Sequence, residues 1–74
     1  MMNSHPILPQ QPQLTPRETQ IVGLVAEGHV NKQIAEVLQI SQWTVSTHLR
    51  RIFVKLQVDT RAAMVAKCSR LSML

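Results

Sequence analysis

The sequence predicts an all-α domain of four short helices, and three observations lead to that prediction. Apolar residues recur with helical spacing in four segments, each segment begins at a residue that commonly caps a helix, and no segment alternates apolar and polar residues as a strand would. The chain of 74 residues is long enough for a single domain. We expect this domain to span residues 14–74, because residues 1–13 are rich in proline and glutamine and are typical of a flexible, disordered tail or linker.

The first helix is expected to begin at Thr15. Thr15 and Glu18 match the T-x-x-E capping box, and Pro16 occupies the first helical position, where its missing N–H group is harmless. Gly28 readily adopts the left-handed backbone that ends many helices, so the helix should stop just before it. The inward face is expected to consist of Ile21, Leu24 and Val25.

A tight turn is expected to join the second and third helices. Asn31 is placed as the cap of a helix over residues 32–38, and Ser41 as the cap of a helix over residues 42–56. An apolar residue inside the turn, Ile40, and a small residue on the second helix would let the two helices pack closely. The side chains expected to meet here are those of Ile34, Ala35, Leu38, Ile40 and Val45.

The third helix has two usable faces when it is turned by about 100° per residue. An apolar face for the core comprises Val45, Leu49, Ile52 and Leu56. The opposite face comprises Ser46, Thr47, Arg50 and Val54, with Arg51 at its margin. Two interpretations of Trp43 remain: its ring lies against a sugar–phosphate backbone, or it covers the edge of the core.

The fourth helix is expected over residues 60–70, with Asp59 as its cap. Its alanines would form a flat apolar surface, which we call the alanine strip (Ala62, Ala63 and Ala66), and Cys68 lies near it in the sequence. A lone cysteine excludes an internal disulfide and fits a reducing cytoplasm. Cys68 is interpreted either as a small buried hydrophobe or as a residue that joins two chains on oxidation.

The net charge of +4 is unevenly distributed along the chain. Residues 1–40 carry two basic and three acidic side chains, a net charge of −1, whereas residues 41–74 carry six basic and one acidic side chain, a net charge of +5. A basic second half is typical of a surface that meets phosphates, although a solvated basic face is the alternative. No apolar run is long enough to span a membrane, and the first residues lack the order of a signal peptide.

A short helix, a tight turn and a longer helix with a basic outer face indicate the helix-turn-helix that reads a DNA major groove. The alternatives are an ordinary helical hairpin and a protein-interaction module that binds an acidic partner. An enzyme is disfavoured, because the sequence has no Cys–His pair, Ser–His–Asp set, paired carboxylates or glycine-rich phosphate loop. His48 lacks a second ligand at helical spacing and is predicted to be packed or bonded to backbone, and we expect no metal and no cofactor.

The chain also resembles the DNA-binding domain of LuxR/FixJ-type (GerE-like) bacterial transcription regulators. The resemblance runs from Leu14 to about Val65 and rests on the segments LTPRETQIVGLVAEG, NKQIAEVLQIS, TVSTHLRRIFVKLQV and TRAAMV. It implies a four-helix fold, a place as the output domain of a longer regulator such as a response regulator, and no enzymatic activity. Ser46 departs from the pattern, since many members carry a lysine there on the recognition helix.

The sequence thus predicts a sequence-specific transcription regulator whose third helix lies in the major groove of double-stranded DNA. Base contacts are assigned to Ser46, Thr47 and Arg50, with Arg50 pairing to guanine and the Thr47 methyl group to thymine. Phosphate contacts are assigned to Asn31, Lys32, Thr44, Arg51 and Lys55.

The resemblance further implies a homodimer on an inverted repeat, with the fourth helices meeting across the two-fold axis. The predicted dimer interface is Ala62, Ala63, Ala66 and Cys68. RNA polymerase is a further candidate partner, and the expected location is the cytoplasm, on the nucleoid.

Overall fold

The computed structural model describes residues 13–74, and nearly all of the predicted tail lies outside the described residues. Four helices follow one another: α1 (Pro16–Ala26), α2 (Asn31–Leu38), α3 (Gln42–Leu56) and α4 (Arg61–Arg70). All regular structure within residues 13–74 is helical, so the all-α prediction is confirmed.

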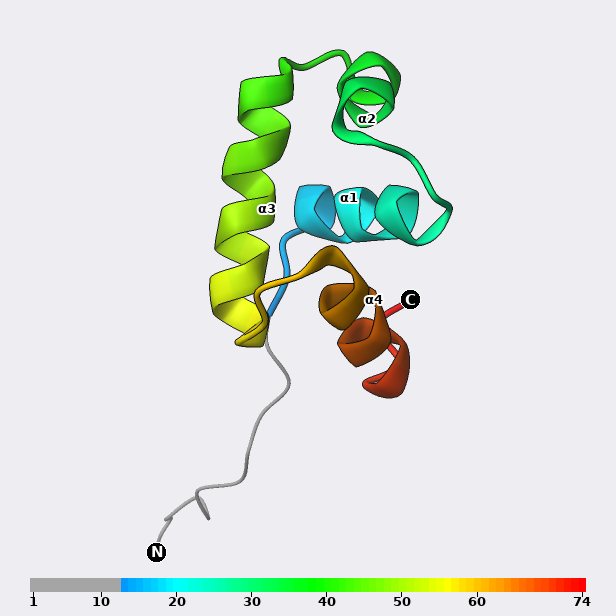
Figure 1. Ribbon diagram of the computed structural model, residues 1–74, viewed down its shortest axis with the longest axis vertical. Coiled ribbons are helices and arrows are strands. Elements are labelled where there is room, and N and C mark those ends of the chain that lie inside the picture. The colour runs from blue at the N-terminus through cyan, green and yellow to red at the C-terminus, as the bar shows by residue number, and fades with distance from the viewer. Residues whose placement is uncertain (1–12) are drawn as a thin grey trace, which may run out of the picture.

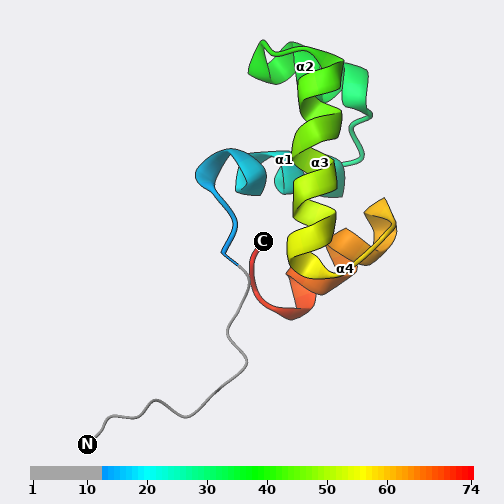
Figure 2. The same ribbon diagram turned by 90° about the vertical axis from the view of Figure 1, so that its left-hand side faces the viewer.

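Helix α1 lies at the centre of the fold and contacts each of the other three helices. In Figure 1 it lies across the molecule between α2 and α4, with the long helix α3 standing beside it. Figure 2 looks at the molecule from the side of α3 and shows this helix in front of the others along its length. One side of α3 therefore packs on the domain, and the other faces solvent.

The core draws on all four helices. The predicted inward face of α3 is confirmed, because Val45, Leu49, Ile52 and Leu56 are all buried. On α1, Val22 is 1% exposed although the sequence did not place it inside. An extra buried position on α1 follows from its central place, since a helix packed on three neighbours buries more than one face. The remaining core residues are Ile21, Val25, Ile34, Ala35, Met64 and Cys68.

Caps at α1 and α3 form as predicted. The Thr15 hydroxyl accepts a hydrogen bond from the Glu18 N–H (3.1 Å), and Glu18 Oε1 accepts one from the Thr15 N–H (2.9 Å), which completes the capping box. The Ser41 hydroxyl accepts from the Thr44 N–H at 3.0 Å. Gly28 has a φ of +96°, as its place after α1 predicted.

The predicted caps of α2 and α4 are wrong by one residue each. Asn31 is the first residue of α2, and Gln33 Oε1 instead accepts the Val30 N–H (3.1 Å) in front of the helix. Helix α4 is capped by Thr60 rather than Asp59, because the Thr60 hydroxyl accepts from the Ala63 N–H at 3.0 Å. The Asn31 side chain is therefore available for contacts away from its own helix end.

The turn between α2 and α3 comprises residues 39–41. Gln39 has a φ of 57°, a left-handed conformation that turns the chain sharply after α2. The next N–H group, of Ile40, donates to the Ala35 carbonyl at 3.0 Å, and the Ile40 side chain packs against the core. Together with the 6% exposure of Ala35, this close turn brings α2 against α3 as the helix-turn-helix interpretation requires.

Candidate nucleic-acid interface

The outward face of α3 is open to solvent. Arg50 and Arg51 are exposed, and Trp43 and Val54 are 73% and 74% exposed. The exposure of Trp43 rules out its place over the core edge and leaves it on the surface beside the basic residues. A double helix approaching this face would meet two guanidinium groups and one indole ring.

Two hydroxyl groups on α3 differ in what they offer to a ligand. The Thr47 hydroxyl donates to the Trp43 carbonyl at 3.0 Å, so its hydrogen is used within the helix. The Ser46 hydroxyl instead accepts from the Asn31 side-chain amide at 3.3 Å. Both side chains are partly exposed, and each retains groups that can reach DNA.

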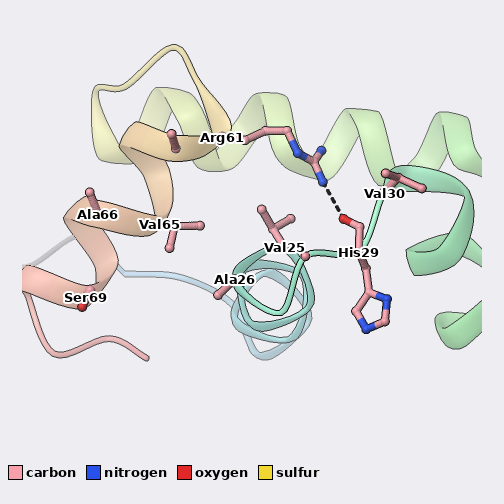
Figure 3. A pocket seen from close by; sticks show the side chains of 10 residues that line it. Val25, Ala26, His29, Val30, Arg61, Val65, Ala66 and Ser69 are labelled. Carbon is pink, nitrogen blue, oxygen red and sulfur yellow. Dashed lines mark hydrogen bonds between the residues drawn. The ribbon is translucent and has the colours of Figure 1, made fainter.

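Asn31 joins the recognition helix to α4. Its side-chain oxygen accepts from Arg61 Nη1 at 2.7 Å, and its amide nitrogen donates to Ser46. The same guanidinium donates from Nη2 to the His29 carbonyl at 2.9 Å, as Figure 3 shows. Arg61, which the sequence reasoning did not single out as a site residue, thus ties the start of α4 to the α1–α2 connection and to α2.

Lys55 has an acidic partner inside the domain. Its Nζ donates to Glu18 Oε1 at 2.6 Å, and the two side chains are 35% and 4% exposed. Burial alone would raise the pKa of Glu18, but hydrogen bonds from Lys55 and Thr15, together with the lysine charge, hold that pKa below its ordinary value. A phosphate contact by Lys55 would have to compete with this ion pair.

Two other residues assigned to phosphates lie in the first turns of α2 and α3. Lys32 is exposed in the first turn of α2, where N–H groups face outward and attract anions. Thr44 is partly buried, and its hydroxyl lies 2.9 Å from the Ser41 hydroxyl at the start of α3. They come from two different helices rather than from one segment.

Two open concavities flank α4. A hollow of about 340 Å³ is lined by residues from α2, α3 and the start of α4, namely Asn31, Ser46, Leu49, Arg50, Phe53 and Arg61. A second hollow of about 600 Å³ lies between the end of α1 and α4, and Figure 3 shows the side chain of Val65 on α4 pointing toward Val25 on α1. The first hollow belongs to the face of α3 that carries the predicted base contacts.

The alanine strip is at least partly accessible, whereas Cys68 is not. Ala62 and Ala66 are exposed and Ala63 is partly exposed, but Cys68 is 0% exposed in the core. Met64 and Cys68 are one helical turn apart and point inward, so Cys68 belongs to the opposite side of α4 from the exposed alanines. Burial also raises the pKa of the Cys68 thiol, which disfavours the reactive thiolate.

Within residues 13–74 no three histidine, cysteine or acidic side chains gather closely enough to hold a metal ion. His48 is partly buried, and its Nδ1 is enclosed without a hydrogen-bond partner among residues 13–74, so the ring is packed rather than bonded to backbone through that atom. None of the four helices has the length and apolar character needed to cross a bilayer.

Comparisons with known proteins agree with this geometry. Residues 12–68 match the family of bacterial regulatory proteins known as the luxR family. The monoamine regulon transcriptional regulator of Klebsiella aerogenes is 52% identical over 54 residues, which are 73% of this chain and 24% of that protein. The crystal structure of the response regulator ChrA, from a heme-sensing two-component system, matches with a TM-score of 0.82 and 37% identity, over 90% of this chain and 33% of that one. The chain therefore spans about a quarter to a third of the length of these relatives.

Proposed function

We infer that this chain, which belongs to the LuxR family of bacterial regulatory proteins, binds a specific operator through α3. It is the helix-turn-helix DNA-binding domain of a transcription regulator and not an enzyme. Its place would be the cytoplasm, as the output domain of a longer regulator. The observation that carries this proposal is the solvent-facing side of α3, which presents Ser46, Thr47 and Arg50 next to one another on a helix set against α2 by a tight turn.

Arg50 is the proposed reader of guanine. It is exposed and lines the hollow beside Ser46, one helical turn away, so its guanidinium can reach a base edge without disturbing the core. A guanidinium pairs with the O6 and N7 atoms of guanine through two hydrogen bonds, the commonest specific contact in the major groove. Thr47 has its hydroxyl hydrogen engaged by Trp43, so its methyl group and oxygen lone pair are what it offers to a thymine or to a donor.

Phosphates on either side of the read bases are proposed to meet Lys32, Thr44 and Arg51. Lys32 and Arg51 are exposed cations. The first turn of α2, which begins at Asn31, adds backbone N–H groups that can donate to the DNA phosphates. Lys55 is left out of this set, because its ammonium group is already paired with Glu18 in the free domain.

A second copy of the domain is proposed to bind the other half of an inverted repeat. The exposed alanine strip supports a contact between two α4 helices, because small side chains let helix backbones approach closely and a two-fold axis makes the same surface meet itself. Cys68 is not part of this proposed contact, because it lies in the core.

The test is selection of bound sites from a random DNA pool, followed by the same selection with Arg50→Ala. We expect the parent to enrich an inverted repeat, and the variant to lose about 1–3 kcal/mol of affinity and the preference at one base pair per half-site. Enrichment of no sequence by the parent would refute the function, and unchanged base preference in Arg50→Ala would refute the assignment of Arg50.

A further inference from the structure

A chain of hydrogen bonds links three helices and ends on the DNA-facing side of α3. It runs from Arg61 on α4 to Asn31 on α2 (2.7 Å) and from Asn31 to Ser46 on α3 (3.3 Å). All three residues line the hollow of about 340 Å³ that also contains Arg50. The chain of bonds therefore reaches the surface proposed to read base edges.

The direction of these bonds follows from the chemistry of the three groups. A guanidinium group has donors only, so the Asn31 atom that faces Arg61 must be the carbonyl oxygen. The Asn31 atom that faces Ser46 is then the NH₂ group, which only donates. The Ser46 oxygen is consequently an acceptor in this bond, and its own hydrogen must point elsewhere.

Arg61 is held firmly enough to impose this direction. Its second terminal nitrogen donates to the His29 carbonyl at 2.9 Å, so hydrogen bonds to Asn31 and His29 both fix the planar guanidinium. Figure 3 shows the guanidinium extended from α4 toward that carbonyl. Rotating the Asn31 amide by half a turn would place its NH₂ group against the guanidinium, where two donors would face each other.

The Ser46 hydrogen has no partner among the described residues. The neighbouring hydroxyl of Thr47 donates back to the Trp43 carbonyl at 3.0 Å, whereas Ser46 makes only the bond from Asn31 within residues 13–74. Ser46 is partly exposed on the outward face. Its hydrogen is thus available to a group that arrives from solvent.

We propose that Ser46 reads DNA as a hydrogen-bond donor, and that Asn31 and Arg61 are positioning residues that fix this polarity. The inference rests on the proposed function, since it requires α3 to enter the major groove. A donor at this position is satisfied by acceptors such as guanine O6 or N7, adenine N7 and thymine O4. Opposite the N4 amino group of cytosine, only the second lone pair of the Ser46 oxygen can accept, and the Ser46 hydrogen finds no base partner. Ser46 thereby disfavours cytosine at the base that it faces.

Asn31→Asp tests the polarity with almost no change in shape. The new carboxylate keeps one oxygen for Arg61, but its other oxygen also accepts, so Ser46 must turn its hydrogen toward that oxygen and away from DNA. We expect Asn31→Asp and Ser46→Ala to lose the same preference against cytosine, by roughly two- to tenfold, the value of one hydrogen bond. Combining them should cause no further loss of that preference.

The added negative charge needs its own control. Gln33→Glu places the same charge in the same turn of α2 and keeps an oxygen for the Val30 N–H, but it does not touch Ser46. Both charged variants should weaken binding to all DNA alike, and only Asn31→Asp should change the base preference. Binding is measured on the selected site and on sites with each of the four bases at every half-site position, and thermal melting reports the fold.

The outcomes separate this inference from the proposed function. A parent that prefers no sequence overturns both. A selective parent whose preference is unchanged by Ser46→Ala, or lost in Ser46→Ala but intact in Asn31→Asp, overturns the inference alone. If Asn31→Asp does not fold, Arg61→Met is measured instead. Methionine keeps an unbranched stem but donates no hydrogen bond, so the Asn31 amide can rotate and the preference against cytosine should fall. An intact preference in Arg61→Met refutes the relay.

Discussion

The ion pair between Lys55 and Glu18 joins the last turn of α3 to the first turn of α1, and its two partners are buried to different extents. The Glu18 side chain is 4% exposed and that of Lys55 is 35% exposed. Lys55→Met leaves a carboxylate enclosed without its cation, whereas Glu18→Gln leaves a lysine that can extend into water. We therefore expect Lys55→Met to destabilise the domain more than Glu18→Gln does.

The size of the effect follows from the degree of burial. Breaking a fully buried pair by removing one partner costs about 3–5 kcal/mol, and an exposed pair is worth about 0–1 kcal/mol. This pair is intermediate, and Glu18 also accepts a hydrogen bond from the Thr15 N–H at 2.9 Å, which Lys55→Met does not remove. We expect losses of about 2 kcal/mol for Lys55→Met and about 1 kcal/mol for Glu18→Gln. Both are large fractions of the roughly 3–9 kcal/mol available to a domain of this size.

Acid should change these two losses in a defined direction. In the parent, the pKa of Glu18 lies below its ordinary value of 4.5, so its ionised form stabilises the fold above that pH, and the stability is lost as the pH falls through the lowered pKa. In Lys55→Met, burial still raises the pKa of Glu18, but the lysine that lowers this pKa is gone. Protonation then relieves the enclosed charge, and the gap between variant and parent should shrink near pH 4.

The assay is urea unfolding followed by helical circular dichroism near pH 7 and near pH 4, for the parent, both single variants and the double variant. Methionine keeps most of the apolar stem of Lys55, which limits the change to the charge. A larger loss for Glu18→Gln than for Lys55→Met, or losses that are the same at both pH values, would refute the reasoning.

The same Lys55→Met protein also tests the contact with DNA predicted from the sequence. A lysine bound to phosphate contributes about 0.9 to the slope of log K against log salt. Because Glu18 already neutralises Lys55, we expect a smaller decrease. A full decrease would show that Lys55 leaves Glu18 for a phosphate when DNA binds.

Two further predictions concern packing and assembly. Ala35→Leu should destabilise the domain by about 1–3 kcal/mol, because Ala35 is 6% exposed where α2 meets α3, and a melting temperature equal to that of the parent would contradict this. Ala66→Glu places a charge on the alanine strip, so it should weaken cooperative binding to a two-half-site operator and leave binding to one half-site nearly unchanged. Gel-shift titration of the two DNAs measures both affinities. Equal losses on both DNAs would place the dimer contact elsewhere.

The helices could be predicted because their signals are local. The capping box of Thr15 and Glu18 spans four residues, and the apolar spacing of α3 repeats within one segment. The contacts that organise the candidate site are not local. Lys55 and Glu18 are 37 residues apart, and Asn31 finds one partner 15 and another 30 residues along the chain. The sequence around Asn31 therefore predicts a helix cap and a phosphate contact, but not the bonds to Ser46 and Arg61.

The fourth helix shows a different limit of sequence reasoning. Alanine, methionine, valine and cysteine occur on several sides of α4, so its composition alone does not decide which side faces the core. Helix α4 packs against α1 and α3, and the side that it buries there carries Met64 and, one turn later, Cys68, both 0% exposed. The packing of α4 against the other helices therefore decides which side faces the core.

Trp43 gives the protein a built-in optical reporter. It is the only tryptophan, the chain has no tyrosine, and the residue is 73% exposed on the side of α3 that would face DNA. Because the indole already lies in water, unfolding changes its surroundings little, and its fluorescence is a poor measure of stability. Contact with a sugar or a base would instead exclude water from the ring. The emission of this single residue can therefore follow DNA binding in a protein that carries no added label.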